Sequence, residues 1–142
     1  MKSFIYERAV QYHETDQMKF VHHSNYIKWF EEARTAFLSD LGFGYDKMES
    51  MGVISPVVSI SCEYKSPSKY GETVCVETKI KEYTGVKVVF SYTVTGKADS
   101  KIKATGESKH CFLSKDSKVV SVKKDLPEID KLIRDCMDIT EH

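Results

Sequence analysis

The pattern of apolar and polar positions predicts one strand, a loop, a long helix and then a run of strands. Residues 4–13 alternate in part and predict a first strand, and residues 14–23 show no period and predict a loop. Over residues 24–41 apolar side chains recur every three or four positions, which is typical of one helical face. That face holds Tyr26, Phe30, Ala33, Phe37 and Leu41. Ser24 is placed to cap this helix and Gly42 to end it.

The remainder of the chain predicts a short helix, several antiparallel strands and a final helix. The short helix covers residues 45–51 and ends at Gly52. Residues rich in Val, Ile, Thr, Tyr and Phe then predict strands at 53–65, 72–83, 86–98, 101–113 and 118–123. Tight turns at Thr84-Gly85 and Asp99-Ser100 would pair consecutive strands antiparallel. The last helix should open near Pro127 and run to about Asp138.

This order of elements predicts an α+β fold. A helix placed after the first strand of an antiparallel sheet needs that sheet to curl around it, because its apolar face would otherwise remain in water. No repeat, low-complexity tract or linker divides the chain, so we expect one domain over residues 1–142.

Charge and cysteine usage narrow the class of protein. Lys+Arg and Asp+Glu both number 21, and this balance lacks the basic excess typical of nucleic-acid binders. No apolar run approaches the 18 or so residues of a membrane span, and the first residues do not form a signal peptide. Four scattered cysteines without a CxxC pair favour buried thiols in a reducing compartment. We therefore expect a cytoplasmic protein, and the neutral charge is compatible with an oligomer.

The densest group of functional side chains lies in residues 12–34, and it carries a resemblance. The matching positions are Thr15-Asp16, His23-Ser24-Asn25-Tyr26, Trp29-Phe30-Glu31, Ala33-Arg34, Tyr64-Lys65-Ser66-Pro67 and Tyr70-Gly71-Glu72. With these motifs the chain resembles the 4-hydroxybenzoyl-CoA thioesterase branch of the hotdog-fold acyl-CoA thioesterases. That branch includes enzymes encoded beside bacterial Tol–Pal genes. The similarity covers roughly residues 4–115.

The resemblance implies a fold, a reaction and two reacting groups. The fold would be a curled antiparallel sheet of five or six strands around one long helix. The reaction would convert an acyl-CoA and water into a carboxylic acid and CoA. Asp16 would be the catalytic carboxylate, and the backbone N–H of His23, seven residues later, would polarise the thioester carbonyl. The resemblance also implies a homodimer with sites at its interface, and dimers that often pair into tetramers.

The chemistry is reasonable independently of the resemblance. Negative charge develops on the carbonyl oxygen during thioester hydrolysis, and the free N–H groups of a helix N-terminus are suited to stabilise it. A nearby carboxylate can attack the carbonyl as a nucleophile or activate water as a general base, and the sequence leaves both routes open. Taken alone, an aspartate before a helix is more often a cap or turn residue.

Further residues of this region are candidates for substrate contacts. The side chain of His22 could line the site, and Asn25 and Tyr26 could contact substrate or a partner subunit. Relatives commonly have glycine where this chain has Lys19, a change that could reshape the pocket. Lys65, Lys69 and Lys87 are candidates for the phosphates of CoA, although each could equally be a solvated surface lysine.

The same region of the sequence allows other interpretations. Adjacent His22 and His23 could suggest a metal site with His13 and either Asp16 or Glu14, but no HxH or HExxH spacing is present, so we expect neither metal nor cofactor. Glu31 and Arg34 could form an intrahelical ion pair. Other functions that remain open are a hydratase or dehydratase, a non-catalytic acyl-CoA sensor, and hydrolysis of acyl-carrier-protein thioesters.

Overall fold

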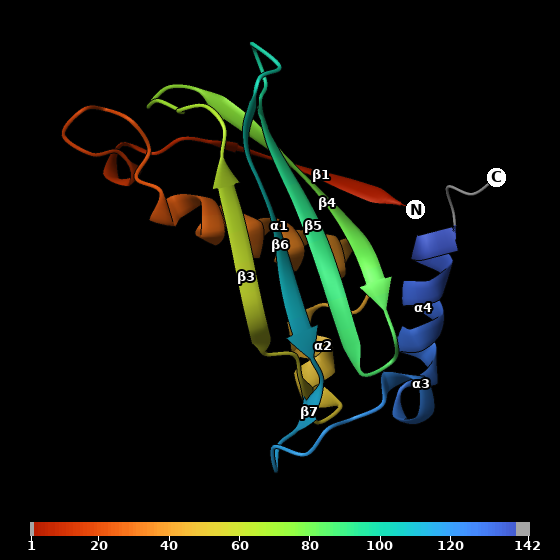
Figure 1. The fold of residues 1–142 in the computed structure, drawn as a ribbon. Coiled ribbons are helices and arrows are strands. Elements are labelled where there is room, and N and C mark those ends of the chain that lie inside the picture. Colours follow the sequence, from red (N-terminus) through yellow and green to blue (C-terminus); the bar gives the residue numbers. More distant parts are fainter. Residues whose placement is uncertain (1, 139–142) are drawn as a thin grey trace.

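A five-stranded antiparallel sheet packs one face against a long helix, α1 (Ser24–Asp40), as Figure 1 shows. The computed structural model describes residues 2–138; Met1 and residues 139–142, which the sequence analysis places in the same domain, lie outside this range. The sheet has the order β1-β4-β5-β6-β3. Its strands are β1 (Ser3–Ala9), β3 (Val57–Tyr64), β4 (Thr73–Tyr83), β5 (Lys87–Gly96) and β6 (Ile102–Cys111).

The core lies between α1 and the sheet, as the helical period predicts. The apolar face is buried at Tyr26, Phe30, Ala33 and Phe37. The Phe30 ring stacks on Tyr92 of β5 with centroids 4.5 Å apart, and Phe37 stacks on Phe4 of β1 at 5.6 Å. One helix therefore contacts both the central strand and an edge strand of the sheet, and the expected hotdog architecture is confirmed.

The strand alternation and the turns of the central sheet are also confirmed. In β4, Val74, Val76, Thr78 and Ile80 are buried, and the residues between them are partly exposed. The β4–β5 turn contains Gly85 at φ +96°, a conformation that glycine adopts without steric cost. Gly42, at φ +93°, follows the end of α1 as expected.

Three predicted strands differ from the structure. The first ends at Ala9 and is followed by a 3₁₀ turn, η1 (Tyr12–Glu14). Residues 53–65 divide at Pro56: β2 (Val53–Ile54) leaves the main sheet and pairs with β7 (Leu113–Ser114). The strand predicted at 118–123 is wrong, because the Ser121 hydroxyl caps a short helix, α3 (Val122–Asp125). Val120 and Val122 are buried against the core, whereas Val119 is exposed and forms only an isolated bridge with Leu113.

The remaining helices close the end of the sheet away from the start of α1. Helix α2 (Tyr45–Ser50) follows α1, and α4 (Pro127–Asp138) confirms the predicted final helix. Ile129 and Ile133 of α4 are buried, and the Tyr83 hydroxyl donates to Asp130 at 2.5 Å. Of the helices that the structure describes, none has the length and apolarity required to cross a membrane.

Candidate active site at the start of helix α1

The loop that carries Asp16 is a closed turn. The Asp16 N–H donates to the Phe20 carbonyl at 2.8 Å, and the Lys19 N–H donates back to the Asp16 carbonyl at 2.9 Å. Below the turn, the His22 N–H donates to the Glu14 carbonyl at 2.9 Å. These bonds bring the two ends of the loop together, so Asp16 is held close to the residues that begin α1.

Asp16 is exposed, and only one of its two carboxylate oxygens accepts hydrogen bonds within the described residues. Its Oδ1 accepts the N–H groups of Met18 at 2.8 Å and Phe20 at 3.3 Å. Within residues 2–138, Oδ2 accepts no hydrogen bond. The turn therefore fixes the side chain through one oxygen and leaves the other available to a ligand.

The backbone N–H of His23 is a free donor at the helix N-terminus. His23 is the N-cap residue, and its N–H donates to no acceptor in the described part of the chain. The N–H groups of Ser24, Asn25 and Tyr26, by contrast, all have protein acceptors. The free N–H and the helix dipole together favour negative charge at this point.

The imidazole of His22, rather than the Ser24 hydroxyl, caps helix α1. Ser24 is already helical, and its N–H donates to His22 Nδ1 at 3.2 Å. The Ser24 hydroxyl lies 2.9 Å from the same nitrogen, so it is also a donor to an unprotonated Nδ1. The predicted Ser24 cap is therefore wrong, because the chain enters the helix one residue earlier than the cap pattern requires.

This cap gives a test of the role of His22 in stability. We expect His22→Ala to lower the free energy of unfolding by about 1 kcal/mol, because the Ser24 N–H loses its acceptor. His22→Asn should retain most of that energy, since its amide oxygen can accept the same N–H. Urea denaturation of the two variants measures the difference, and equal losses in both would contradict the capping role.

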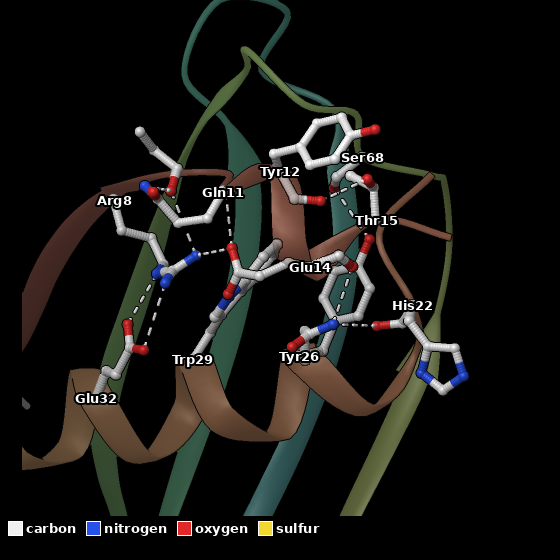
Figure 2. A network of polar contacts seen from close by, with 12 residues as sticks. Arg8, Gln11, Tyr12, Glu14, Thr15, His22, Tyr26, Trp29, Glu32 and Ser68 are labelled. Carbon is white, nitrogen blue, oxygen red and sulfur yellow. Dashed lines mark hydrogen bonds and ion pairs between the residues drawn. The ribbon is translucent and has the colours of Figure 1, made fainter. Parts of the chain in front are cut away.

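A buried carboxylate, that of Glu14, ties the loop to the sheet and to α1 (Figure 2). Its Oε1 accepts Arg8 Nη1 at 2.6 Å and the Gln11 N–H at 2.8 Å, and its Oε2 accepts the Trp29 Nε1–H at 2.9 Å. Burial by itself would raise the pKa of Glu14, but the bonds from Arg8, Trp29 and Gln11 outweigh it and lower the pKa. Glu14 is therefore an ionised anchor for the loop that precedes Asp16.

Asn25 and Tyr26, predicted to contact substrate or a partner, have buried side chains in this structure. The Asn25 amide donates to the carbonyls of Glu14 at 3.0 Å and His22 at 3.2 Å. The Tyr26 hydroxyl donates to Ser68 Oγ at 3.0 Å. Their observed contacts hold the loop and the helix start in place, and a substrate contact stays a prediction for both.

The lysines predicted to contact substrate lie at different places in the structure. Lys19 is exposed at the tip of the Asp16 turn and has φ +69°, a left-handed conformation that costs a lysine about 1–2 kcal/mol. Lys65 follows Tyr64, whose hydroxyl donates to the His23 carbonyl at 3.1 Å, and its Nζ pairs with Glu63 at 2.9 Å. Both therefore remain near the candidate site.

Lys87 does not join this site within one protomer. It begins β5 at the hairpin with Tyr83, whereas the Asp16 loop follows the other end of the sheet, where Ala9 pairs with Thr73. A ten-residue strand such as β5 spans about 30 Å. Within one protomer, strand direction, which the sequence does not show, therefore places Lys87 at the far end of the sheet from Asp16.

A second polar cluster lies in the core and was missed from the sequence. Arg34 is buried and donates to the hydroxyls of Tyr45 at 2.6 Å and Tyr92 at 3.1 Å, so the predicted pair with Glu31 is wrong. Ser108 lies 2.8 Å from His110 Nε2 in the same cluster. Burial and the Arg34 cation lower the pKa of His110 to about 4, so this histidine is neutral in the folded protein.

The described residues give no support to a metal site. No group of three or more His, Cys, Asp or Glu in residues 2–138 could hold a metal ion. The Glu14 carboxylate, one of the candidate ligands, is fully engaged by Arg8, Gln11 and Trp29. Cys62, Cys75 and Cys111 are half-buried, Cys136 is buried, and all four are free thiols.

Comparison with known proteins identifies the family to which the chain belongs. The family model described as "Thioesterase-like superfamily" matches residues 10–131. YneP of Bacillus subtilis, by its name a candidate acyl-CoA thioesterase, is 47% identical over 86% of this chain and 88% of its own. The solved DHNA-CoA thioesterase of Staphylococcus aureus is 30% identical, with a TM-score of 0.92 over 99% of this chain and 95% of its own.

A more distant solved structure shares the fold alone. A 4-hydroxybenzoyl-CoA thioesterase superposes with a TM-score of 0.80 over 91% of this chain and 99% of its own, at 18% identity. The hotdog fold and the resemblance found in the sequence are thus confirmed at the level of the superfamily.

Proposed function

The chain belongs to the thioesterase-like superfamily, and we propose that it hydrolyses acyl-CoA thioesters with Asp16 and the His23 backbone N–H as the reacting groups. It is an enzyme of the acyl-CoA thioesterase type. The observation that supports this assignment is that both residues lie on one closed loop. There a free carboxylate oxygen and a free N–H precede the same helix.

In the proposed reaction, the thioester carbonyl oxygen accepts the His23 N–H. As negative charge builds on this oxygen, its interactions with the His23 N–H and with the helix dipole become stronger, and this lowers the barrier. A preorganised donor of this kind contributes roughly 3 kcal/mol to an acyl transfer. The Tyr64 hydroxyl and the His22 cap keep this end of α1 in place.

Asp16 acts on the carbonyl carbon by one of two routes. As a nucleophile, Oδ2 forms a bond to that carbon, the carbon–sulfur bond breaks, CoA leaves as a thiolate that takes a proton from solvent, and water hydrolyses the mixed anhydride. As a general base, Oδ2 takes a proton from water, whose oxygen attacks instead, and the departing thiolate receives a proton. The exposed position of Oδ2 is compatible with both.

The experiment that tests this function measures thiol release from a panel of acyl-CoAs with short aliphatic, long aliphatic and aromatic acyl groups. We expect repeated turnover of at least one class. An enoyl-CoA in the same panel separates hydrolysis from hydration, because hydration removes the conjugated absorbance without releasing thiol. Stoichiometric binding of every acyl-CoA without turnover would refute hydrolysis and favour an acyl-CoA sensor.

The proposed active form is a homodimer joined through strand β3. Within the described residues, this strand forms an edge of the sheet and pairs with β6 alone. Half of the exposed large apolar side chains gather on or just before it, at Met51, Ile54, Val57, Val58, Ile60 and Tyr64. An open edge with an apolar surface is well suited to pair with a second copy. Because Tyr64 contacts His23, that copy would border the site.

Multi-angle light scattering tests the dimer with two matched variants. Val58 and Val119 are 64% and 70% exposed, so lysine at either position should be tolerated by the fold. We expect a dimer or tetramer for the wild type and for Val119→Lys, and a monomer for Val58→Lys, because a buried unpaired charge is costly at an interface. A monomeric wild type would refute the proposal.

A further inference from the structure

An exposed aromatic pair lies on the outer side of the Asp16 loop. Tyr12 is 74% exposed and Tyr70 is 60% exposed, and their rings meet edge to face with centroids 5.7 Å apart. Figure 2 shows the Tyr12 ring pointing away from α1. Met18, at the tip of the loop, is 72% exposed. Large exposed side chains grouped in this way indicate a contact surface rather than a core.

The same surface carries unpaired positive charge. Lys19 and Lys69 form no ion pair with a carboxylate in the described part of the chain. The Lys69 ammonium instead lies 5.4 Å from the centre of the Phe20 ring. We call Tyr12, Met18, Lys19, Lys69 and Tyr70 the loop patch.

The backbone links the two halves of the loop patch. Phe20 forms an isolated bridge with Lys69, and the Val21 N–H donates to the Ser68 carbonyl at 2.8 Å. The carboxylates nearby are occupied: Glu14 binds Arg8, and Glu72 faces Lys103 at 3.6 Å. Apart from Asp16 itself, the patch therefore presents aromatic rings and cations to a ligand.

We propose that the loop patch binds the phosphoadenosine end of the CoA substrate, with adenine on Tyr12 and Tyr70 and the phosphates near Lys19 and Lys69. Aromatic side chains stack on nucleobases, and lysines bind phosphates as point charges. The Cα atoms of Tyr12 and Asp16 are at most about 14 Å apart, a distance that the flexible pantetheine arm can span. The inference rests on the proposed function, since it requires a CoA thioester at Asp16.

The test compares two thioesters of the same acid, one of CoA and one of N-acetylcysteamine, which lacks the nucleotide. In the double variant Tyr12→Ala, Tyr70→Ala, we expect the ratio of kcat/KM for the CoA ester to that for the short ester to fall roughly tenfold. Lys19→Gly, which also relieves the left-handed backbone strain and so should fold, is expected to lower that ratio several-fold. Lys118→Ala, an exposed lysine on a distant loop, serves as the matched control.

Calorimetry with adenosine 3′,5′-bisphosphate separates failure of this inference from failure of the proposed function. Binding to the wild type that weakens in both patch variants would support the loop patch even if neither thioester were hydrolysed. An unchanged ratio, or a wild type that does not bind the bisphosphate, would overturn it. So would a change of molecular mass in the tyrosine variant without a change in nucleotide binding, because the patch would then be a contact between protein copies.

Discussion

Replacing Asp16 with asparagine is expected to lower kcat/KM for acyl-CoA hydrolysis at least ~100-fold, whichever route the carboxylate takes. The asparagine amide oxygen can still accept the N–H groups of Met18 and Phe20, so the turn should keep its shape. It can neither attack the thioester carbonyl as an anion nor take a proton from water. The loss should therefore appear in kcat rather than in the stability of the fold.

Thiol release and urea denaturation, measured on the same preparations, check this expectation. Asp16→Ala should lose at least as much activity, and it should also loosen the turn. Asp116→Asn is the control, because Asp116 is likewise an exposed loop aspartate but lies near β7. Wild-type activity in Asp16→Asn would remove Asp16 from the mechanism and leave the His23 N–H as the proposed reacting group.

The second large effect is expected at Glu14. Glu14→Gln should lower the free energy of unfolding by about 2 kcal/mol at pH 7. A neutral amide pairs poorly with the Arg8 guanidinium, and its NH₂ group would face the N–H donors that the carboxylate now accepts. Since the Glu14 carbonyl and carboxylate position the Asp16 loop, kcat/KM should also fall, roughly tenfold. Glu32→Gln is the matched control: Glu32 contacts the same Arg8 at 2.8 Å but is more exposed.

The stability difference between wild type and Glu14→Gln should depend on pH in a defined direction. Because the folded-state pKa of Glu14 is lowered, its stabilisation is complete above the unfolded value of about 4.5 and is lost as pH falls through the folded value. Urea denaturation should thus give a constant difference from pH 7 to about pH 5 and a smaller one below. Because His110 is buried and neutral, acid also lowers the stability of both proteins through this residue, but the effect is equal in the two and drops out of the difference. A difference that grows in acid would contradict the role of Glu14.

The loop that carries Asp16 illustrates how much of the structure local sequence patterns predict. The sequence pattern predicts the loop and the helix after it, because both are local features, and the family resemblance adds Asp16 and the His23 N–H as the proposed reacting groups. It does not predict which group caps the helix. In the structure the Ser24 N–H donates to the His22 ring, and the His22 N–H donates to the Glu14 carbonyl.

The sequence by itself determined the buried face of α1, the alternation of β4 and the turn at Gly85, because each depends on backbone periods of a few residues. Only the tertiary structure decided the partners of the buried charges. Glu14 meets Trp29 from fifteen residues away, and Arg34 binds Tyr92 rather than the adjacent Glu31. It also placed Lys87 at the far end of the sheet and left β3 as an open edge. These features depend on which segments meet after the chain has folded, and a buried charge binds whichever partner the core brings within reach.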